Sequence, residues 1–197
     1  MMHTMERYFT NEKETQLTDT IAEGVLRTIK TMVLEALTNP TCYAARANLM
    51  LAGSKSHDGL TGLGCVPDFA CHAIEHELSA MFDVAHGAGL TAIWSSWAKY
   101  VIHVNPNRFA QFAVNVWGVE NDFYDPMSTG LRGIEAWNQW CHAIGMPTNL
   151  HELGIKLTEK QIEQIAEGAV AARGGEYAGH FMPLYVSDIV EILKLAE

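Results

Sequence analysis

Apolar residues recur with a helical period along almost the whole chain. Between Leu17 and Thr38 they fall four residues apart, and the pattern stops at Asn39-Pro40, because proline disfavours a helical backbone in the residue before it. This apolar stripe consists of Ile21, Val25, Ile29, Val33 and Leu37. Similar patterns cover residues 41–57, 67–82, 87–103, 106–117, 128–144, 158–173 and 185–196. No stretch alternates as a strand does, so the sequence predicts an all-α fold, a multi-helix bundle.

Length and composition indicate one domain. With 197 residues, 48% of them apolar, the chain can bury a sizeable core, and no linker divides it, so residues 1–197 are expected to form a single helical domain. The net charge of −10, with Lys and Arg scattered singly, argues against a nucleic-acid or membrane partner. Four cysteines without Cys-x-x-Cys spacing are typical of reduced thiols, and we expect a cytoplasmic protein.

Three histidines form the pattern with the clearest chemistry. His72 and His76 lie four residues apart on one predicted helix face, and His86 follows a turn signal that can bring it back toward that face. A lone histidine is more often a core residue than a ligand. Three imidazoles at this spacing, however, favour a site for a divalent metal ion.

Other features have structural interpretations. Gly59, Gly62 and Gly64 precede the His72 helix; they form either a phosphate cradle or, as we favour, a loop between helices that at most supports the metal helix. The tryptophans, Met50 and Met81 fall at helical spacings and are expected in the core, although Phe82 and Trp94 flank the histidine segments. His180 is expected to be structural.

Two stretches resemble a known enzyme family. The run Val66-Pro-Asp-Phe-Ala-Cys-His72-Ala-Ile-Glu-His76-Glu-Leu-Ser-Ala-Met-Phe-Asp-Val-Ala-His86-Gly-Ala-Gly-Leu resembles the signature of iron-containing (group III) alcohol dehydrogenases, in the NADPH-dependent butanol dehydrogenase and aldehyde reductase branch. The start of the chain resembles the family's helix Asp-x-x-x-His-x-x-Glu-x-Tyr, with His3 in the histidine position. The family's Asp would fall ahead of Met1.

The resemblance implies a site and a reaction. It makes His3, His72 and His86 metal ligands for Fe²⁺ or Zn²⁺ and makes His76 a catalytic residue that relays a proton or positions substrate. The implied reaction is hydride transfer between NADP(H) or NAD(H) and a small primary alcohol or aldehyde. The resemblance covers only the family's C-terminal helical half. We therefore expect the N-terminal nucleotide-binding α/β domain to be absent, the isolated chain to be inactive, and the possible partners to be that domain or further copies of the chain.

Two other functions fit the same residues. His72-x-x-Glu75-His76 is the inverted zinc-peptidase motif, in which both histidines bind zinc and the glutamate is the general base. Alternatively, the chain is a helical remnant that does no chemistry. Metal uptake distinguishes the remnant from the enzymes, and the identity of the closest imidazole pair distinguishes the peptidase from the dehydrogenase.

Overall fold

The computed structural model describes residues 1–197 and contains no sheet; one isolated bridge joins Ala178 and Leu184. The α-helices are α1 (Met2–Tyr8), α2 (Gln16–Thr38), α3 (Tyr43–His57), α4 (Ala70–Phe82), α5 (His86–Val101), α6 (Pro106–Phe112), α7 (Pro126–Ala143), α8 (Glu159–Ala171) and α9 (Val186–Leu195). Short 3₁₀ turns occur at η1 (Leu60–Gly62) and η2 (Ile102–Val104), and a π-helical turn, η3 (Ala113–Trp117), extends α6. The all-α prediction is confirmed.

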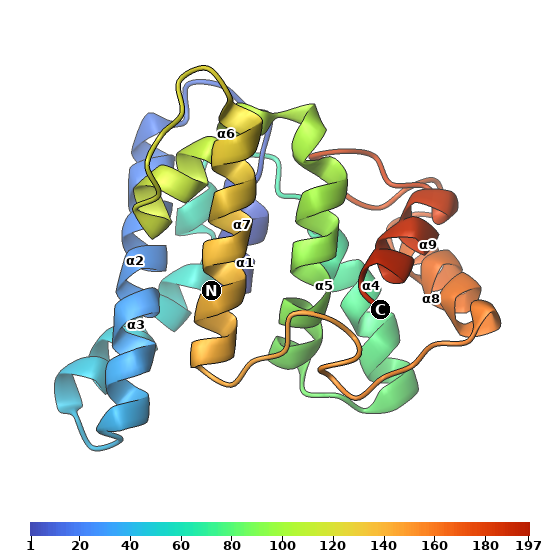
Figure 1. Ribbon diagram of the computed structural model, residues 1–197, viewed down its shortest axis with the longest axis horizontal. Coiled ribbons are helices and arrows are strands. Elements are labelled where there is room, and N and C mark those ends of the chain that lie inside the picture. Colours follow the sequence, from blue (N-terminus) through green and yellow to red (C-terminus); the bar gives the residue numbers. More distant parts are fainter.

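The helices pack around a central pair. Helices α4 and α5 contact each other, with α8 and α9 on one side and α7 on another (Figure 1). The hairpin of α2 and α3 lies at the opposite end of the molecule from α8 and α9 (Figure 1). The short helix α1 contacts α2, α3 and α5, which places His3 beside the central pair. No helix combines the length and the apolar character needed to cross a membrane.

Side chains fix several helix ends. A capping box starts α8, with Thr158 and Gln161 each satisfying the other's backbone N–H. Asn105 and Asp125 cap α6 and α7, and a proline follows each cap where its missing N–H costs nothing. The helix predicted from residue 67 begins instead at Ala70, because the segment before it turns through a left-handed conformation.

The core is aromatic. Trp94, Trp97 and Trp137 are at most 1% exposed, and the rings of Phe9 and Phe109 lie 4.6 Å apart, so these three tryptophans occupy the core as predicted. The same expectation is wrong for Met50, which is 78% exposed, and Met81 is also partly exposed. Helix α3 buries only small residues (Ala45, Ala52 and Ser56), so its larger apolar side chains stay on the surface.

The apolar stripe predicted on α2 only partly matches its buried face: Ile29 is buried, but the other four positions of the stripe are partly or largely exposed. Leu37 is 55% exposed, whereas Ala22 and Leu26 are fully buried. Two acids share the buried face: Glu23 accepts a hydrogen bond from Tyr8, and Asp19 pairs with both terminal nitrogens of Arg108 at 2.5 and 2.6 Å. The apolar pattern misses part of this face because two of its five buried residues are acids, which are satisfied mainly by partners distant in sequence.

Candidate metal centre

Three helices bring four histidines into one cluster. His3 comes from α1, His72 and His76 from α4, and His86 is the first residue of α5. Helix α4 ends at Phe82, and the left-handed backbone of the next residue, Asp83 (φ 51°), reverses the chain so that α5 starts beside α4. The predicted turn therefore returns His86 to the face that carries His72.

The rings of the three predicted ligands lie side by side but are unevenly spaced. The ring centres of His72 and His86 are 5.2 Å apart, and those of His3 and His72 are 4.4 Å apart. Two imidazoles that bind one ion at about 2.0–2.1 Å place their centres roughly 5 Å apart, so both pairs fit a shared ion. His3 and His86 are 6.5 Å apart, and they must approach each other if all three bind together.

His76 lies at the edge of the same cluster. Its ring centre is 6.0 Å from that of His72 and 5.4 Å from that of His86, and its side chain is exposed. His72 is therefore nearer to His86 than to His76. This order matches the ligand pair implied by the family resemblance and differs from the pair that the peptidase motif requires.

Two buried carboxylates hold the imidazoles from behind. The Nδ1 atom of His72 is hydrogen-bonded to Glu6, and the Nδ1 atom of His86 is hydrogen-bonded to Glu75. Both glutamates are fully buried. Metal-binding histidines commonly donate one ring N–H to a carboxylate, which fixes the tautomer and leaves the other nitrogen for the metal. Sequence reasoning missed both supports: Glu6 matches the glutamate of the family's first motif, but nothing in the spacing shows that either acid faces a histidine.

An unsatisfied atom supports a metal at this position. The Nε2 atom of His72 is buried and has no hydrogen-bond partner, although buried polar atoms are usually paired. Burial and then the neighbouring His86 and His76 lower the pKa of His72 to about 3. Burial and His72 lower the pKa of His3 to about 3 as well. Both imidazoles are thus neutral near pH 7, the form that binds a metal, so the residues present fit a divalent ion.

Glu75, His76 and His86 form a competing set, since their potential ligand atoms lie within 4.8 Å of one another. Glu75 is already committed, however, because one carboxylate oxygen accepts from Ser79 and the other is bonded to His86. For Glu75 to bind a metal or activate water as a peptidase base, these bonds would have to break inside the core. Glu75 therefore fits a supporting role better than a ligand or base role.

Phe69 forms a wall beside the cluster. Its ring lies 5.0 Å from that of His72, and its backbone adopts a left-handed conformation (φ 54°), which costs a non-glycine residue energy. The guanidinium groups of Arg7 and Arg173 lie 5.2 and 5.9 Å from the ring, and Arg173 also donates to the Phe69 carbonyl. These contacts hold an aromatic side chain beside the histidine cluster at the start of α4.

Asp68 anchors the same turn from the core. Its carboxylate accepts hydrogen bonds from the backbone N–H groups of Ala70, His180 and Phe181. Burial and the nearby Glu6 raise the pKa of Asp68 to about 7. The His180 ring itself is at the surface, and its backbone has the structural role expected for this residue.

The glycine-rich segment before α4 packs tightly against α1. A Cβ atom on Gly62 would lie 2.8 Å from the Arg7 side chain, and residues 60–62 form the turn η1. Close packing accounts for a glycine at this position without a phosphate. The helix-connecting interpretation of this loop therefore fits its geometry.

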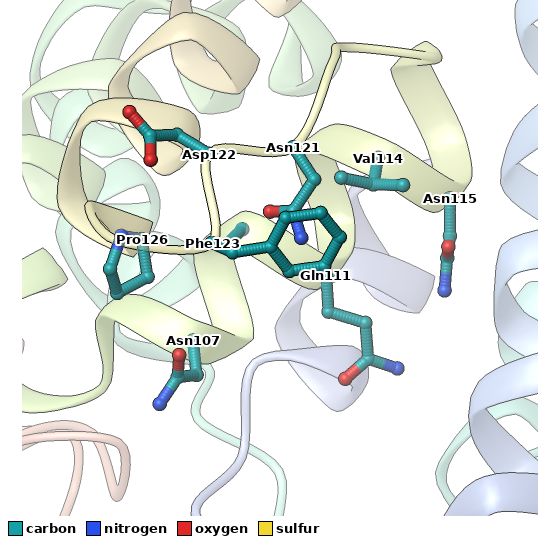
Figure 2. A pocket seen from close by; sticks show the side chains of 9 residues that line it. Asn107, Gln111, Val114, Asn115, Asn121, Asp122, Phe123 and Pro126 are labelled. Carbon is teal, nitrogen blue, oxygen red and sulfur yellow. The ribbon is translucent and has the colours of Figure 1, made fainter.

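A polar hollow of about 340 Å³ lies elsewhere, along α6 and the loop before α7 (Figure 2). Its amides include Gln111, Asn115 and Asn121, and the Phe123 ring extends over it (Figure 2). Gln111 and Asn115 already donate to Glu23. The hollow contains no histidine, so the histidine cluster remains the candidate functional site.

Comparison with known proteins identifies the family. The sequence profile described as "Fe-containing alcohol dehydrogenase family, C-terminal" matches residues 1–196. The chain belongs to the iron-containing alcohol dehydrogenase family. The resemblance inferred from the histidine motif is thus confirmed, and the matched region is the C-terminal one of that family.

Individual relatives of this iron-containing dehydrogenase domain support the family assignment. The NADH-dependent butanol dehydrogenase A of Clostridium acetobutylicum is 34% identical over 195 residues, covering 98% of this chain and 49% of the relative. The NADPH-dependent aldehyde reductase YqhD of Escherichia coli is 29% identical over 176 residues, covering 84% of this chain and 45% of the relative. The crystal structure of butanol dehydrogenase A from Thermotoga maritima superposes with a TM-score of 0.89 at 36% identity, over 99% of this chain and 49% of that one. The chain spans about half the length of these relatives.

Proposed function

We propose that this chain is the metal-binding half of a dehydrogenase that interconverts small primary alcohols and aldehydes with NAD(H) or NADP(H). One observation carries the proposal: two imidazoles from α4 and α5, each backed by a buried carboxylate, stand 5.2 Å apart with one ring nitrogen of each left free. The names of the relatives support the reaction class, since they include NADH-dependent butanol dehydrogenases and an NADPH-dependent aldehyde reductase.

His3, His72 and His86 are the proposed ligands. A divalent ion, Fe²⁺ or Zn²⁺, would supply Lewis acidity toward the substrate oxygen when bound there. Glu6 and Glu75 keep the imidazoles of α4 and α5 in the tautomer that offers Nε2. The ring of Phe69 lies against the His72 imidazole on one side of the cluster.

His76 is the proposed proton carrier. Its imidazole stands one helical turn from His72 and is exposed, so it reaches both the cluster and the solvent. An exposed imidazole can accept the hydroxyl proton as hydride leaves the alcohol carbon and can pass that proton to water. The hydride acceptor is the nicotinamide, which we propose is held by a separate nucleotide-binding α/β unit.

Metal uptake by four alanine variants tests the assignment. We expect the 197-residue chain to take up one Zn²⁺, and we expect His72→Ala and His86→Ala to weaken the affinity most, because each removes a ligand with a buried support. His3→Ala should also weaken the affinity, whereas His76→Ala should retain one ion. Loss of the ion in His76→Ala with retention in His3→Ala would favour the peptidase arrangement, and no uptake by the parent chain would favour a non-catalytic remnant.

A further inference from the structure

The imidazole of His3 is held differently from the other two proposed ligands. His72 and His86 are each fixed by a carboxylate, whereas the His3 ring makes no hydrogen bond within the chain. Its closest ring neighbour is His57, at the end of α3: the ring centres are 4.0 Å apart and the ring planes are tilted by 39°. His57 is therefore the group best placed to restrain the His3 side chain.

The surrounding contacts lock the two backbones together. Thr4, next to His3, shares a buried hydrogen bond of 2.8 Å with the hydroxyl of Ser56, which precedes His57. The guanidinium of Arg7 donates both to the Ser56 carbonyl, at 2.5 Å, and to the His3 carbonyl, at 3.1 Å. These bonds tie α1 to the last turn of α3, so the proximity of the two imidazoles is built into the fold.

The orientation of His57 is also set locally. Its Nδ1 atom is hydrogen-bonded to the Gly53 carbonyl one turn earlier, at 3.1 Å. The residue is exposed, so one face of its ring covers His3 and much of the remainder faces solvent. His57 thus lies between the His3 ring and bulk water.

We propose that His57 is a positioning residue that holds the His3 imidazole by ring stacking, the role that Glu6 and Glu75 perform for His72 and His86 through hydrogen bonds. The inference rests on the proposed metal site and adds a residue to it. Two imidazoles bound to one ion stand roughly 5 Å apart and splay around it. The shorter separation and the 39° tilt of this pair indicate ring-on-ring contact, so we infer that His57 acts on His3 through its aromatic surface and not through a metal-binding nitrogen.

Substitutions that separate ring surface from nitrogen test this role. The probe is Co²⁺, whose visible absorption reports binding and coordination, titrated against a competing chelator. His57→Leu should weaken Co²⁺ binding by about tenfold or more, as loss of a supporting group typically does. His57→Phe should restore affinity close to that of the parent chain. In a His3→Ala background, His57→Leu should have no further effect.

A matched control comes from His103, another exposed histidine near a helix end with Nδ1 bonded to a backbone carbonyl (Tyr100, 2.9 Å). His103→Leu should leave Co²⁺ affinity unchanged. A second readout needs no metal: the ring-current shift of the His3 Cε1–H resonance in NMR spectra of the metal-free chain should be lost in His57→Leu and kept in His57→Phe.

Three results would overturn the proposal. Equal weakening by Phe and Leu at position 57 would make His57 a direct ligand. Parent-like affinity in His57→Leu would make the stack irrelevant to the site, and an unchanged His3 resonance would show that no stack forms. If the parent chain binds no Co²⁺, the proposed function fails, and the NMR comparison alone then decides whether His57 holds His3.

Discussion

At the scale of single residues, the arrangement of the cluster depends on a glycine that touches no imidazole. A Cβ atom on Gly89 would lie 2.6 Å from Oε1 and 2.7 Å from Cγ of Glu75, so an alanine there must displace the carboxylate behind His86. We expect Gly89→Ala to lower Zn²⁺ affinity by about 10–100-fold, the usual cost of disturbing a ligand's support. Competition with a chromophoric chelator measures this.

Gly87 provides the matched control for that substitution. It lies in the same first turn of α5, and an added Cβ would meet only the tip of Met146, at 4.0 Å. Gly87→Ala should therefore bind Zn²⁺ like the parent chain, with circular dichroism showing that both variants fold. Parent-like affinity in Gly89→Ala would mean that the position of the Glu75 carboxylate does not matter to the site.

Asp68 gives a pH-dependent prediction. Its pKa is raised to about 7 by burial and Glu6, above the ordinary aspartate value, so the folded state binds this proton more tightly than the unfolded state does. The stabilisation from this group is therefore complete below the unfolded pKa, near 4, and is lost as the pH rises through about 7. Asn at this position cannot titrate.

Asp68→Asn should consequently destabilise the metal-free chain more at pH 5 than at pH 8. We expect a loss of about 1–3 kcal/mol in the free energy of unfolding at pH 5, because one backbone donor loses its acceptor. The loss should shrink toward pH 8. Urea denaturation at both pH values measures it, with Glu163→Gln on the exposed side of α8 as control. A difference that grows from pH 5 to pH 8 would contradict the raised pKa.

At the scale of elements, α7 approaches the π-helical turn so closely that only glycine fits. A Cβ atom on Gly133 would stand 2.5 Å from the Cβ and 2.8 Å from the Cα of Ala113. Gly133→Ala should cost about 1–3 kcal/mol in the free energy of unfolding, because α7 and η3 must separate. Gly24, inside α2, has nothing within 4 Å of an added Cβ, so Gly24→Ala should gain up to about 1 kcal/mol. Denaturation midpoints of the two variants measure this difference. Equal changes in stability for Gly133→Ala and Gly24→Ala would contradict the packing argument.

The elements themselves were largely predictable from sequence. Helical periodicity and the Asn39-Pro40 break locate α2, and the Thr158 cap locates α8, because both signals are local. The left-handed turn at Phe69 and the π-helical turn after α6 were not predicted, since tertiary contacts impose them. The buried face of α2 was partly misassigned because its acids are satisfied mainly by side chains distant in sequence, among them Tyr8 and Arg108.

The candidate site was predictable to a smaller extent. The motif around His72 and His86, together with the family resemblance, selects the histidines that the structure clusters. It says nothing of which groups lie behind them: Glu6 supports a histidine from another helix, and the contact of His57 with His3 spans the first and third helices. Such contacts depend on the packing of α1, which no local pattern encodes.

At the scale of the whole molecule, we expect the 197-residue chain to lack dehydrogenase turnover by itself. It spans about half the length of its relatives, and its glycine-rich turn is occupied by Arg7. Assays with butanol plus NAD or NADP, and with butyraldehyde plus NADH or NADPH, should give no reaction with Zn²⁺ or Fe²⁺ supplied. An intact butanol dehydrogenase is the positive control. Turnover on the order of 1–1000 per second would contradict the proposal that a separate unit must hold the nicotinamide.

The position of α1 has a consequence for the thermal stability of the chain. The chain has four free cysteines and no disulfide, yet the contact between Glu6 and His72 already joins positions 66 residues apart. An ion shared by His3, His72 and His86 would fasten the same two segments together and act as a reversible cross-link. Because it would bind the folded chain and not the unfolded one, its protection against heat would grow with the free metal concentration. The ion of the proposed catalytic site would then also stabilise the fold. A chelator would remove this stabilisation, as a reducing agent removes that of a disulfide.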